Sequence, residues 1–201
     1  MGDARILVVG STMIDLIAYA DRLPEAGETL VGKRFQMGFG GKGANQAVMA
    51  ARFGAPVAMV NAVGDDSYGA SHLENFKREG IDITWMRTVA GSSGVAPIWV
   101  DGAGVNRIII VPGANDATEA AVAEAAVREF KPTIVVGQFE VPQSTTLAAF
   151  RAARAAGIAT LLNPAPAAPI PCPPPEPAPP DPGIPAASGA NPLARRPSGP
   201  R

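Results

Sequence analysis

Residues 38–63 read GFGGKGANQAVMAARFGAPVAMVNAV, a glycine-rich loop followed by a helical pattern and then by an apolar strand. The helical spacing over Asn45–Phe53 stops at Gly54, as is typical where a glycine follows the C-terminus of a helix. Val57–Val63 is a continuous apolar run of the kind found in strands buried on both faces. This succession predicts part of a parallel sheet that is covered by helices.

The same alternation of buried strands and amphipathic helices continues on both sides of this stretch. Further strands are predicted at Arg5–Gly10, Thr133–Gly137 and Ile158–Leu162, and further helices at 67–79, 117–130 and 144–156. This order predicts an α/β fold with a mostly parallel sheet. Extended segments within 17–37 and 94–111 interrupt the order, and they predict a small separate β-sheet that could serve as a lid.

Composition and charge limit the classes to which the protein can belong. Of the 201 residues, 47% are hydrophobic and 17% are charged, which is typical of a globular domain. The net charge of −1 gives no electrostatic attraction to nucleic acid or to an anionic membrane. The N-terminus lacks a signal-peptide pattern, and the single Cys172 cannot form an intramolecular disulfide. We therefore expect a cytoplasmic protein that binds neither nucleic acid nor membrane.

The proline content divides the chain into two parts. Of the 21 prolines, 15 lie in the last 38 residues. Prolines at this density exclude helices and central strands, so residues 169–201 are predicted to be a disordered, polyproline-like tail. A ligand for proline-binding domains is an alternative role for this tail. The folded part is expected to span residues 1–168.

The glycine-rich loop allows several interpretations. Gly38, Gly40 and Gly43 formally satisfy the G-x-G-x-x-G pattern of dinucleotide-binding loops, but that pattern should follow the first strand directly, and here it does not. A phosphate-binding P-loop is excluded because Lys42 is followed by glycine instead of Ser or Thr. Two interpretations stay open from the residues alone: a loop that only permits close packing, with Asn45 as a helix N-cap, or a loop that binds an uncharged ligand.

The loop and its surroundings resemble the N-terminal signature of the ribokinase (PfkB-type) carbohydrate kinases. The resemblance extends in order over residues 4–168, through the segments GSTMIDL (10–16), LPEAGETLVG (23–32), FGGKGANQAVMAARFGA (39–55), VGDDSYG (63–69), GVAPIWVDGAGVNRIIIVPGAN (94–115), GQFEVP (137–142) and LLNPAPA (161–167). It implies a ribokinase-like three-layer sandwich with a mostly parallel sheet and a small β lid. Because the later family motifs are missing, we expect the domain to be C-terminally incomplete.

The resemblance also implies an activity, the ATP-dependent phosphorylation of D-ribose to D-ribose 5-phosphate, and a set of sugar-binding residues. These are Asp15, Gly41, the backbone of Lys42, Asn45 and Glu140, with Asn163 as a remnant of the nucleotide-binding side. The chemistry fits, since carboxylates and amides can share many hydrogen bonds with a neutral polyol. For Asp15 a turn-capping role is an alternative, and for Glu140 a solvated loop position.

The family motifs of the second half are absent from the sequence. No GAGD segment with its catalytic aspartate occurs, and Asn163 is not followed by the glutamate of an NxxE motif. We therefore assign no catalytic residue and no metal ligand, and expect this chain to be inactive alone. The family uses ATP and Mg²⁺, with K⁺ as a further ion, and we do not expect this chain alone to hold them. The abrupt change after Ala167 leads us to expect that the tail derives from a frameshift or a retained intron.

Three expectations concern partners and single residues. The chain could form a homodimer through the lid or through an exposed edge of the main sheet, where the missing half would otherwise pack. Such an edge predicts marginal stability.

His72 is expected to be a surface or packing residue, and Trp99 is a candidate to face the interior of the lid. Two alternatives to a ribose kinase are a non-catalytic sugar-binding fragment and a kinase of the same family for another sugar or a nucleoside.

Overall fold

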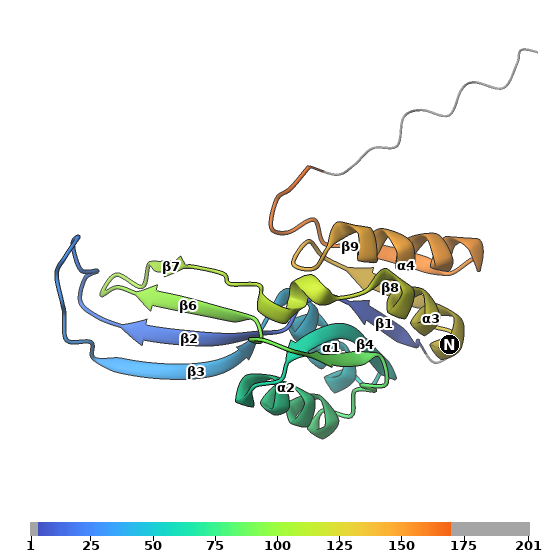
Figure 1. The fold of residues 1–201 in the computed structure, drawn as a ribbon, viewed down its shortest axis with the longest axis horizontal. Coiled ribbons are helices and arrows are strands. Elements are labelled where there is room, and N and C mark those ends of the chain that lie inside the picture. Colours follow the sequence, from blue (N-terminus) through green and yellow to red (C-terminus); the bar gives the residue numbers. More distant parts are fainter. Residues whose placement is uncertain (1–3, 170–201) are drawn as a thin grey trace, which may run out of the picture. The chain divides into compact units, whose positions relative to one another are not determined.

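The computed structural model describes residues 4–169, and the fold discussed here lies within the unit Met1–Ala168. Five strands form the main sheet, in the order β5-β4-β1-β8-β9, and every neighbouring pair is parallel (Figure 1). Their bounds are β1 Ile6–Val9, β4 Val57–Gly64, β5 Met86–Val89, β8 Ile134–Gly137 and β9 Ala159–Leu162. The predicted parallel sheet is confirmed.

Helices cover both faces of this sheet. On one face lie α1 (Lys42–Arg52) and α2 (Ser67–Arg78), and on the other lie α3 (Ala120–Phe130) and α4 (Gln143–Ala155) (Figure 1). Both faces of the sheet need a cover because both are apolar, as β1 shows. Successive side chains of a strand point to opposite faces. Leu7 and Val9 belong to the apolar core beneath α3 and α4, whereas Val8 belongs to the core beneath α1 and α2. The three-layer arrangement is thus built into the apolar runs.

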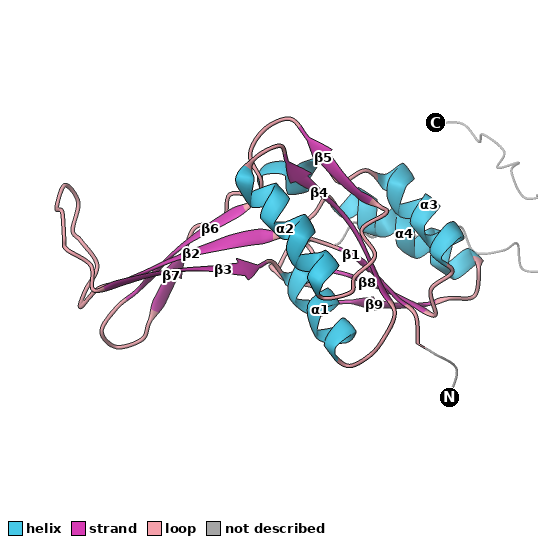
Figure 2. Ribbon diagram, turned by 90° about the horizontal axis from the view of Figure 1, so that it is seen from below, coloured by secondary structure: helices cyan, strands magenta, loops and turns pink. Residues whose placement is uncertain are grey.

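A second sheet of four strands extends away from the helices and forms the lid (Figure 2). Its order is β3-β2-β6-β7, with bounds β2 Met13–Tyr19, β3 Arg34–Gly40, β6 Val95–Val100 and β7 Asn106–Ile108. The central pair β2–β6 is parallel, and the outer pairs are antiparallel. The chain enters the lid after β1, returns to form α1, and enters it a second time after β5. The predicted lid sheet is therefore present.

The ends of the helices follow local rules. The carboxylate of Asp66 accepts a hydrogen bond from the N–H of Gly69 (2.8 Å) and caps α2. The alternative in which Asn45 is the N-cap of α1 is wrong. The helix begins at Lys42, because Gly41 adopts a φ of +93° that only glycine tolerates well, and this turns the chain into the helix earlier.

Some predicted bounds differ from the structure. Residues 29–33 belong to the range 17–37 in which extended segments were predicted, but they lie in the loop between β2 and β3. The β2–β3 ladder ends with the pair of Tyr19 and Arg34. The edge strand β5 was missed, and so was the 3-10 helix η1 (Gly113–Ala117) that precedes α3. Of the helices in residues 4–169, none has both the length and the apolar character that a bilayer span requires. The predicted tail at 170–201 lies outside the described residues.

Candidate functional site

A cavity of about 230 Å³ lies between the lid and the edge of the main sheet where β1 and β8 end. It is lined by Met13, Asp15, Gly41, Lys42, Asn45, Ala96, Ile98, Ile108, Ile110 and Glu140. Open α/β sheets place their ligands beyond the carboxyl ends of the strands, and this cavity has that position. Five of the six predicted binding residues thus share one cavity, and Asn163 is not among its lining residues.

The lid contributes an apolar wall to the cavity. Ala96 and Ile98 are alternate residues of β6, and Ile108 pairs with Ile98 across the β6–β7 ladder. Because alternate residues of a strand face the same side, Trp99 must face the opposite side of the lid. The suggestion that Trp99 faces the cavity was therefore wrong. Isoleucine and alanine side chains can cover the C–H face of a small ligand without competing for its polar groups.

Glu140 follows β8 and lies on the polar side of the cavity. Its Oε2 accepts hydrogen bonds from Ser11 Oγ (2.6 Å) and from the backbone N–H of Lys42 (2.8 Å), and its Oε1 accepts one from Lys42 Nζ (2.7 Å). Burial disfavours the charged form, but the hydrogen bonds from Lys42 and Ser11 outweigh burial and lower the pKa of Glu140. Glu140 is therefore an ionised, fixed carboxylate and not a solvated loop charge.

Asp15 approaches the cavity from β2, and its environment differs from that of Glu140. Within residues 4–169 its carboxylate accepts no hydrogen bond, so both oxygens stay available to a ligand. Burial and the nearby negative charge of Glu140 raise the pKa of Asp15. Asp15 pairs with Gly38 across the β2–β3 ladder, and Gly40 lies directly beside its carboxylate. These glycines leave room for an acidic side chain at the neck of the lid.

The glycine-rich loop forms the base of the cavity. A β-carbon at Gly41 would lie 2.9 Å from backbone atoms of Ser11, Thr12 and Met13, so only glycine fits this contact. The first N–H groups of α1 are all occupied by protein acceptors: Lys42 by Glu140, Gly43 by Ser11 Oγ, Ala44 by the Ser11 carbonyl and Asn45 by the Gly41 carbonyl. A phosphate cradle needs such groups free, so the loop is not arranged as one.

The two predicted asparagines lie in different places. Asn45 is in the first turn of α1, and its side chain lines the cavity. Asn163 directly follows β9, and its N–H donates to the carbonyl of Gly137 at the end of β8 (2.9 Å). It therefore shares the carboxyl edge of the sheet with the cavity. Its predicted role on the nucleotide side stays a prediction.

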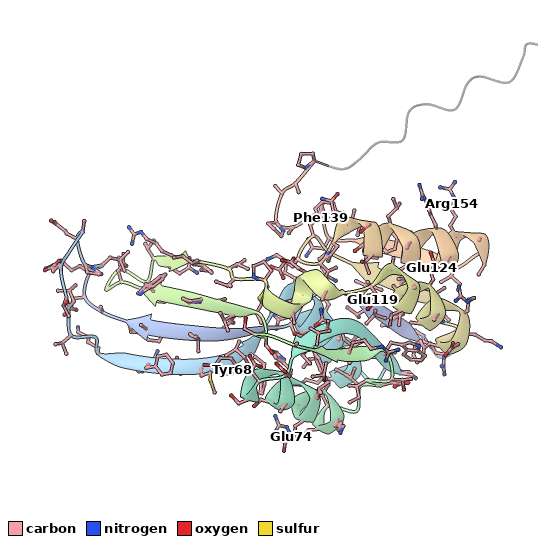
Figure 3. All side chains as sticks on the ribbon, in the orientation of Figure 1. Tyr68, Glu74, Glu119, Glu124, Phe139 and Arg154 are labelled. Carbon is pink, nitrogen blue, oxygen red and sulfur yellow. The ribbon has the colours of Figure 1, made fainter. Side chains whose placement is uncertain are left out.

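A second cavity of about 310 Å³ adjoins the first, and both are lined by Met13, Ile110 and Glu140. It extends toward the loop between β8 and α4, where Phe139 lies (Figure 3). Its other charged lining residue is Asp116, which would repel a phosphate group. Within residues 4–169, no three His, Cys, Asp or Glu side chains gather to hold a metal ion. The described residues therefore do not fit ATP or Mg²⁺, and we assign no chemistry through either to them.

Several residues of the site were missed from the sequence. Ser11 bridges Glu140 and the glycine-rich loop, and the apolar residues Met13, Ile98, Ile108 and Ile110 form the lid wall. The alternation of apolar residues in the lid strands was the signal available for the wall. His72 was expected at the surface or in packing, and it is fully buried between Phe39 and Phe76.

Comparisons with known proteins show the family to which the chain belongs. The model of the "pfkB family carbohydrate kinase" matches residues 3–172. Mouse ribokinase is 42% identical over 168 residues, covering 82% of this chain and 51% of the mouse protein. The deoxyribokinase of Salmonella typhi is 42% identical over 164 residues, covering 81% of this chain and 54% of that protein.

A solved structure shows the same fold. Arabidopsis thaliana ribokinase, determined in complex with ribose and ATP, superimposes with a TM-score of 0.69 at 30% sequence identity. The superposition covers 79% of this chain and 53% of the Arabidopsis chain. The chain therefore spans about half the length of the curated relatives and of the structure that it matches.

Proposed function

We propose, because this chain belongs to the pfkB family of carbohydrate kinases, that its lid cavity binds D-ribose as the phosphoryl acceptor of a ribokinase-type reaction. The observation that carries the proposal is the convergence of Asp15, Asn45 and Glu140 on one cavity with an aliphatic wall. Asp15 and Asn45 reach it from the lid and from α1, and Glu140 from the loop after β8. A pentose has hydroxyl groups on its edge and C–H groups on its faces. The hydroxyls match the polar side chains of the cavity, and the C–H groups match its aliphatic wall.

The charges in the cavity favour an uncharged ligand. Lys42 is paired with Glu140, so the described lining of the cavity offers no free cation to a sugar phosphate. Asp15 adds a carboxylate that has no hydrogen-bond donor within residues 4–169. Two carboxylates repel anions but accept hydrogen bonds from hydroxyl groups. This arrangement therefore supports a free sugar instead of a phosphorylated one.

The size of the cavity separates sugars from nucleosides. At about 230 Å³ it lies below the roughly 300–1,000 Å³ typical of sites for drug-sized ligands. A monosaccharide is the class that such a volume accommodates, whereas a nucleoside would need the adjoining cavity as well. 2-Deoxy-D-ribose is the second candidate, because the Salmonella deoxyribokinase is as similar to this chain as mouse ribokinase is.

We further propose that the 201-residue chain binds ribose without phosphorylating it. The sequence has no GAGD segment, and the described residues offer neither a phosphate cradle nor a metal site. Phosphoryl transfer depends on positioning and on charge stabilisation at the transferred group. A kinase of the relatives' length would add ATP and Mg²⁺, with K⁺ as a further ion. We also propose a cytoplasmic location, and a homodimer formed through the lid or through the edge at β9.

Calorimetric titration of the chain with D-ribose tests the proposal. We expect saturable binding by the natural sequence, and at least a 10-fold loss of affinity in Asp15→Ala and in Glu140→Gln. Glu124→Gln is the matched control, because Glu124 lies on α3 (Figure 3), is not among the residues that line the cavity, and has a half-exposed side chain paired with Arg128. Equal affinity of Asp15→Ala and the natural sequence would overturn the proposed site. If 2-deoxy-D-ribose bound more tightly than D-ribose, 2-deoxy-D-ribose would be the ligand of the cavity.

An assay of ADP release in the presence of ribose tests the catalytic part separately. We expect no ribose-dependent release by the purified chain. Ribose-dependent ADP release that disappears in Asp15→Ala would show that the chain is an active kinase. The binding experiment and this assay can therefore fail independently.

A further inference from the structure

We propose that Asn115 is a positioning residue that holds the lid in register with the main sheet and thereby places Asp15 over the cavity. Asn115 lies in η1, outside the cavity, and is fully buried. It contacts the backbone at three of the points where the chain crosses between the main sheet and the lid. The Glu140 carboxylate binds Ser11 at the first of these points and the N–H of Lys42 where the chain returns to α1.

The first crossing is the segment between β1 and β2. The Oδ1 atom of Asn115 accepts a hydrogen bond from the N–H of Thr12 (2.9 Å), and its Nδ2 donates to the carbonyl of Thr12 (2.8 Å). Both backbone groups of one residue are thus bound by one side-chain amide, as they would be by a neighbouring strand. Asp15 is three residues further along, so the position of Thr12 sets where β2 carries Asp15.

The other crossings lie at the start of β6 and after β7. The Nδ2 of Asn115 also donates to the carbonyl of Pro112, where the chain leaves the lid (2.7 Å). At the entry to β6, a β-carbon on Gly94 would overlap that same Nδ2 atom, so the backbone of Gly94 packs directly against the amide. Gly94 in turn accepts a hydrogen bond from the N–H of Ile14 in β2 (2.9 Å). The three crossings therefore meet around one side chain.

The main sheet fixes Asn115 through Asn61. Asn61 lies in β4, and its Nδ2 donates to the Oδ1 of Asn115 (2.9 Å), while its Oδ1 accepts from the hydroxyl of Thr12 (2.9 Å). Asn61 and Thr12 are each about 1% exposed. The Oδ1 of Asn115 thus accepts two hydrogen bonds, and its Nδ2 donates to two backbone carbonyls and also lies 3.7 Å from the sulfur of Met13, so the hydrogen-bonding capacity of the amide is filled. A buried network that is completely satisfied specifies one geometry, because any displacement leaves buried polar groups without partners.

The lid has little other buried contact to hold its orientation. Most residues of β3 and all residues of β7 are exposed. On the side of the lid away from the cavity, Tyr68 of α2 lines a space of about 100 Å³ together with Met37 and Phe39 (Figure 3). Contacts of this kind are apolar and carry little directional information. The directional contacts at the base of the lid therefore come from Asn115 and, on the cavity side, from Glu140 with Ser11 and Lys42.

Hydrogen–deuterium exchange of the full chain tests this attachment without any ligand. In Asn115→Ala we expect amide exchange in the lid strands β2 and β6 to become at least 10-fold faster, while exchange in β1 and β8 stays within about 2-fold. Val127→Ala is the matched control, because Val127 is buried in the core beneath α3 and should affect lid and main sheet together. Equal acceleration in both sheets of Asn115→Ala, or none in the lid, would overturn the proposal.

Asn115→Asp provides a second variant with the same side-chain shape, in case the alanine variant does not fold. It keeps the oxygen that accepts from Thr12 and Asn61 but loses both donated hydrogen bonds, so exchange in the lid should again rise more than exchange in β1. A uniform rise in this variant would equally contradict the proposal.

The consequence for the sugar rests on the proposed function. At a temperature where all variants are folded, we expect Asn115→Asp to bind D-ribose at least 5-fold more weakly and Val127→Ala to bind it normally. Unchanged affinity in a variant with an accelerated lid would show that Asn115 does not position Asp15. If the natural sequence does not bind ribose, the proposed function fails, and the exchange experiment still decides whether Asn115 holds the lid.

Discussion

Gly40 lies so close to Asp15 that a β-carbon on Gly40 would overlap the Asp15 carboxylate, and all three of its nearest atoms would belong to that side chain. The same atom on Gly38, two residues earlier on β3, would meet nothing within 4 Å. We therefore expect Gly40→Ala to displace the carboxylate from the cavity and to weaken D-ribose binding by about 10-fold, or ~1.4 kcal/mol. Gly38→Ala should bind normally. Calorimetric titration of both variants decides the matter, and equal affinities would show that Asp15 does not contact the sugar.

The ion pair between Lys42 and Glu140 should contribute to stability. The Glu140 side chain is 5% exposed and that of Lys42 is 35% exposed, so removal of the cation leaves a buried carboxylate with fewer partners. We expect Lys42→Met to lower the free energy of unfolding by about 2 kcal/mol, between the values for exposed and for fully buried pairs.

The control for this variant is Lys33→Met. Lys33 pairs with Asp21 at the surface of the lid, where both side chains are mostly exposed, so the change should be within about 0.5 kcal/mol. Urea denaturation of both variants provides the comparison. Similar losses in the two variants would show that the buried position of Glu140 has no energetic consequence.

As the pH is lowered, the affinity for D-ribose should begin to fall at a higher pH than it would if Asp15 had the pKa of an ordinary aspartate. Burial and the charge of Glu140 raise the pKa of Asp15 above its ordinary value of 3.8, and the protonated form loses acceptor capacity for sugar hydroxyls. Binding should therefore weaken as the pH falls through the raised pKa. In Glu140→Gln the repulsion is removed, so the midpoint should move to lower pH. Titrations at several pH values, with folding followed by circular dichroism, would reveal either shift, and identical midpoints would contradict this account.

His72 should make the stability of the chain dependent on pH. Its ring is packed against Phe39 of the lid, with ring centroids 5.2 Å apart, and among the described residues neither ring nitrogen has a hydrogen-bond partner. Burial lowers the pKa of His72 from 6.5 to about 4, against smaller opposing effects of the nearby Met13 backbone and of the charge on Asp66. Between these values the unfolded chain binds a proton that the folded chain does not. Stability is therefore complete above the unfolded pKa and decreases as the pH falls toward 4.

The size of this effect can be measured by urea denaturation at about pH 7.5 and about pH 5, where we expect a loss of ~2 kcal/mol. His72→Leu has an uncharged side chain in the same place and should lose less stability over the same interval. If the stability of His72→Leu depended on pH as that of the natural sequence does, the loss of stability would arise from other groups.

The strand β9 is the last strand of the described sheet, and Leu161 on it is 54% exposed. Exposed apolar edge strands promote association between chains, and a lysine on the edge opposes it. We expect Leu161→Lys to slow aggregation on heating several-fold. Leu147→Lys is the control, because Leu147 is comparably exposed but belongs to the helix α4 and not to a strand. Light scattering during a temperature ramp measures both, and equal rates would show that β9 is not the site of association.

The main sheet could be predicted because its strands are short apolar runs bounded by helices with clear ends. Val57–Val63 and Thr133–Gly137 were predicted within one residue of β4 and β8. The edge strand β5 was missed because Arg87 and Thr88 interrupt the apolar pattern at exposed positions. The start of α1 was misplaced because asparagine is a common N-cap, and the unusual backbone of Gly41 cannot be read from its identity alone.

The site was predictable only in part, for a similar reason. Asp15, Gly41, Asn45 and Glu140 stand in recognisable segments, and the structure brings them to one cavity. The contacts around Asn115 join residues 12, 61 and 115, which lie in three unrelated local patterns. No periodicity connects such residues, since only the packed fold brings them together.

The parallel pairing of β2 with β6 has a consequence for the order in which the chain folds. The antiparallel pair β2–β3 joins segments that are close in the chain. Ile14 of β2 also pairs with Val95 of β6, although β4, α2 and β5 lie between these two residues in the chain. Contacts between segments so distant in the chain form slowly, because the intervening loop must first be closed. In the main sheet, Ile6 of β1 pairs with Ile134 of β8 over a still longer stretch of chain. Both sheets therefore depend on distant contacts, and we infer that the cavity between them acquires its native shape only when the described fold is complete.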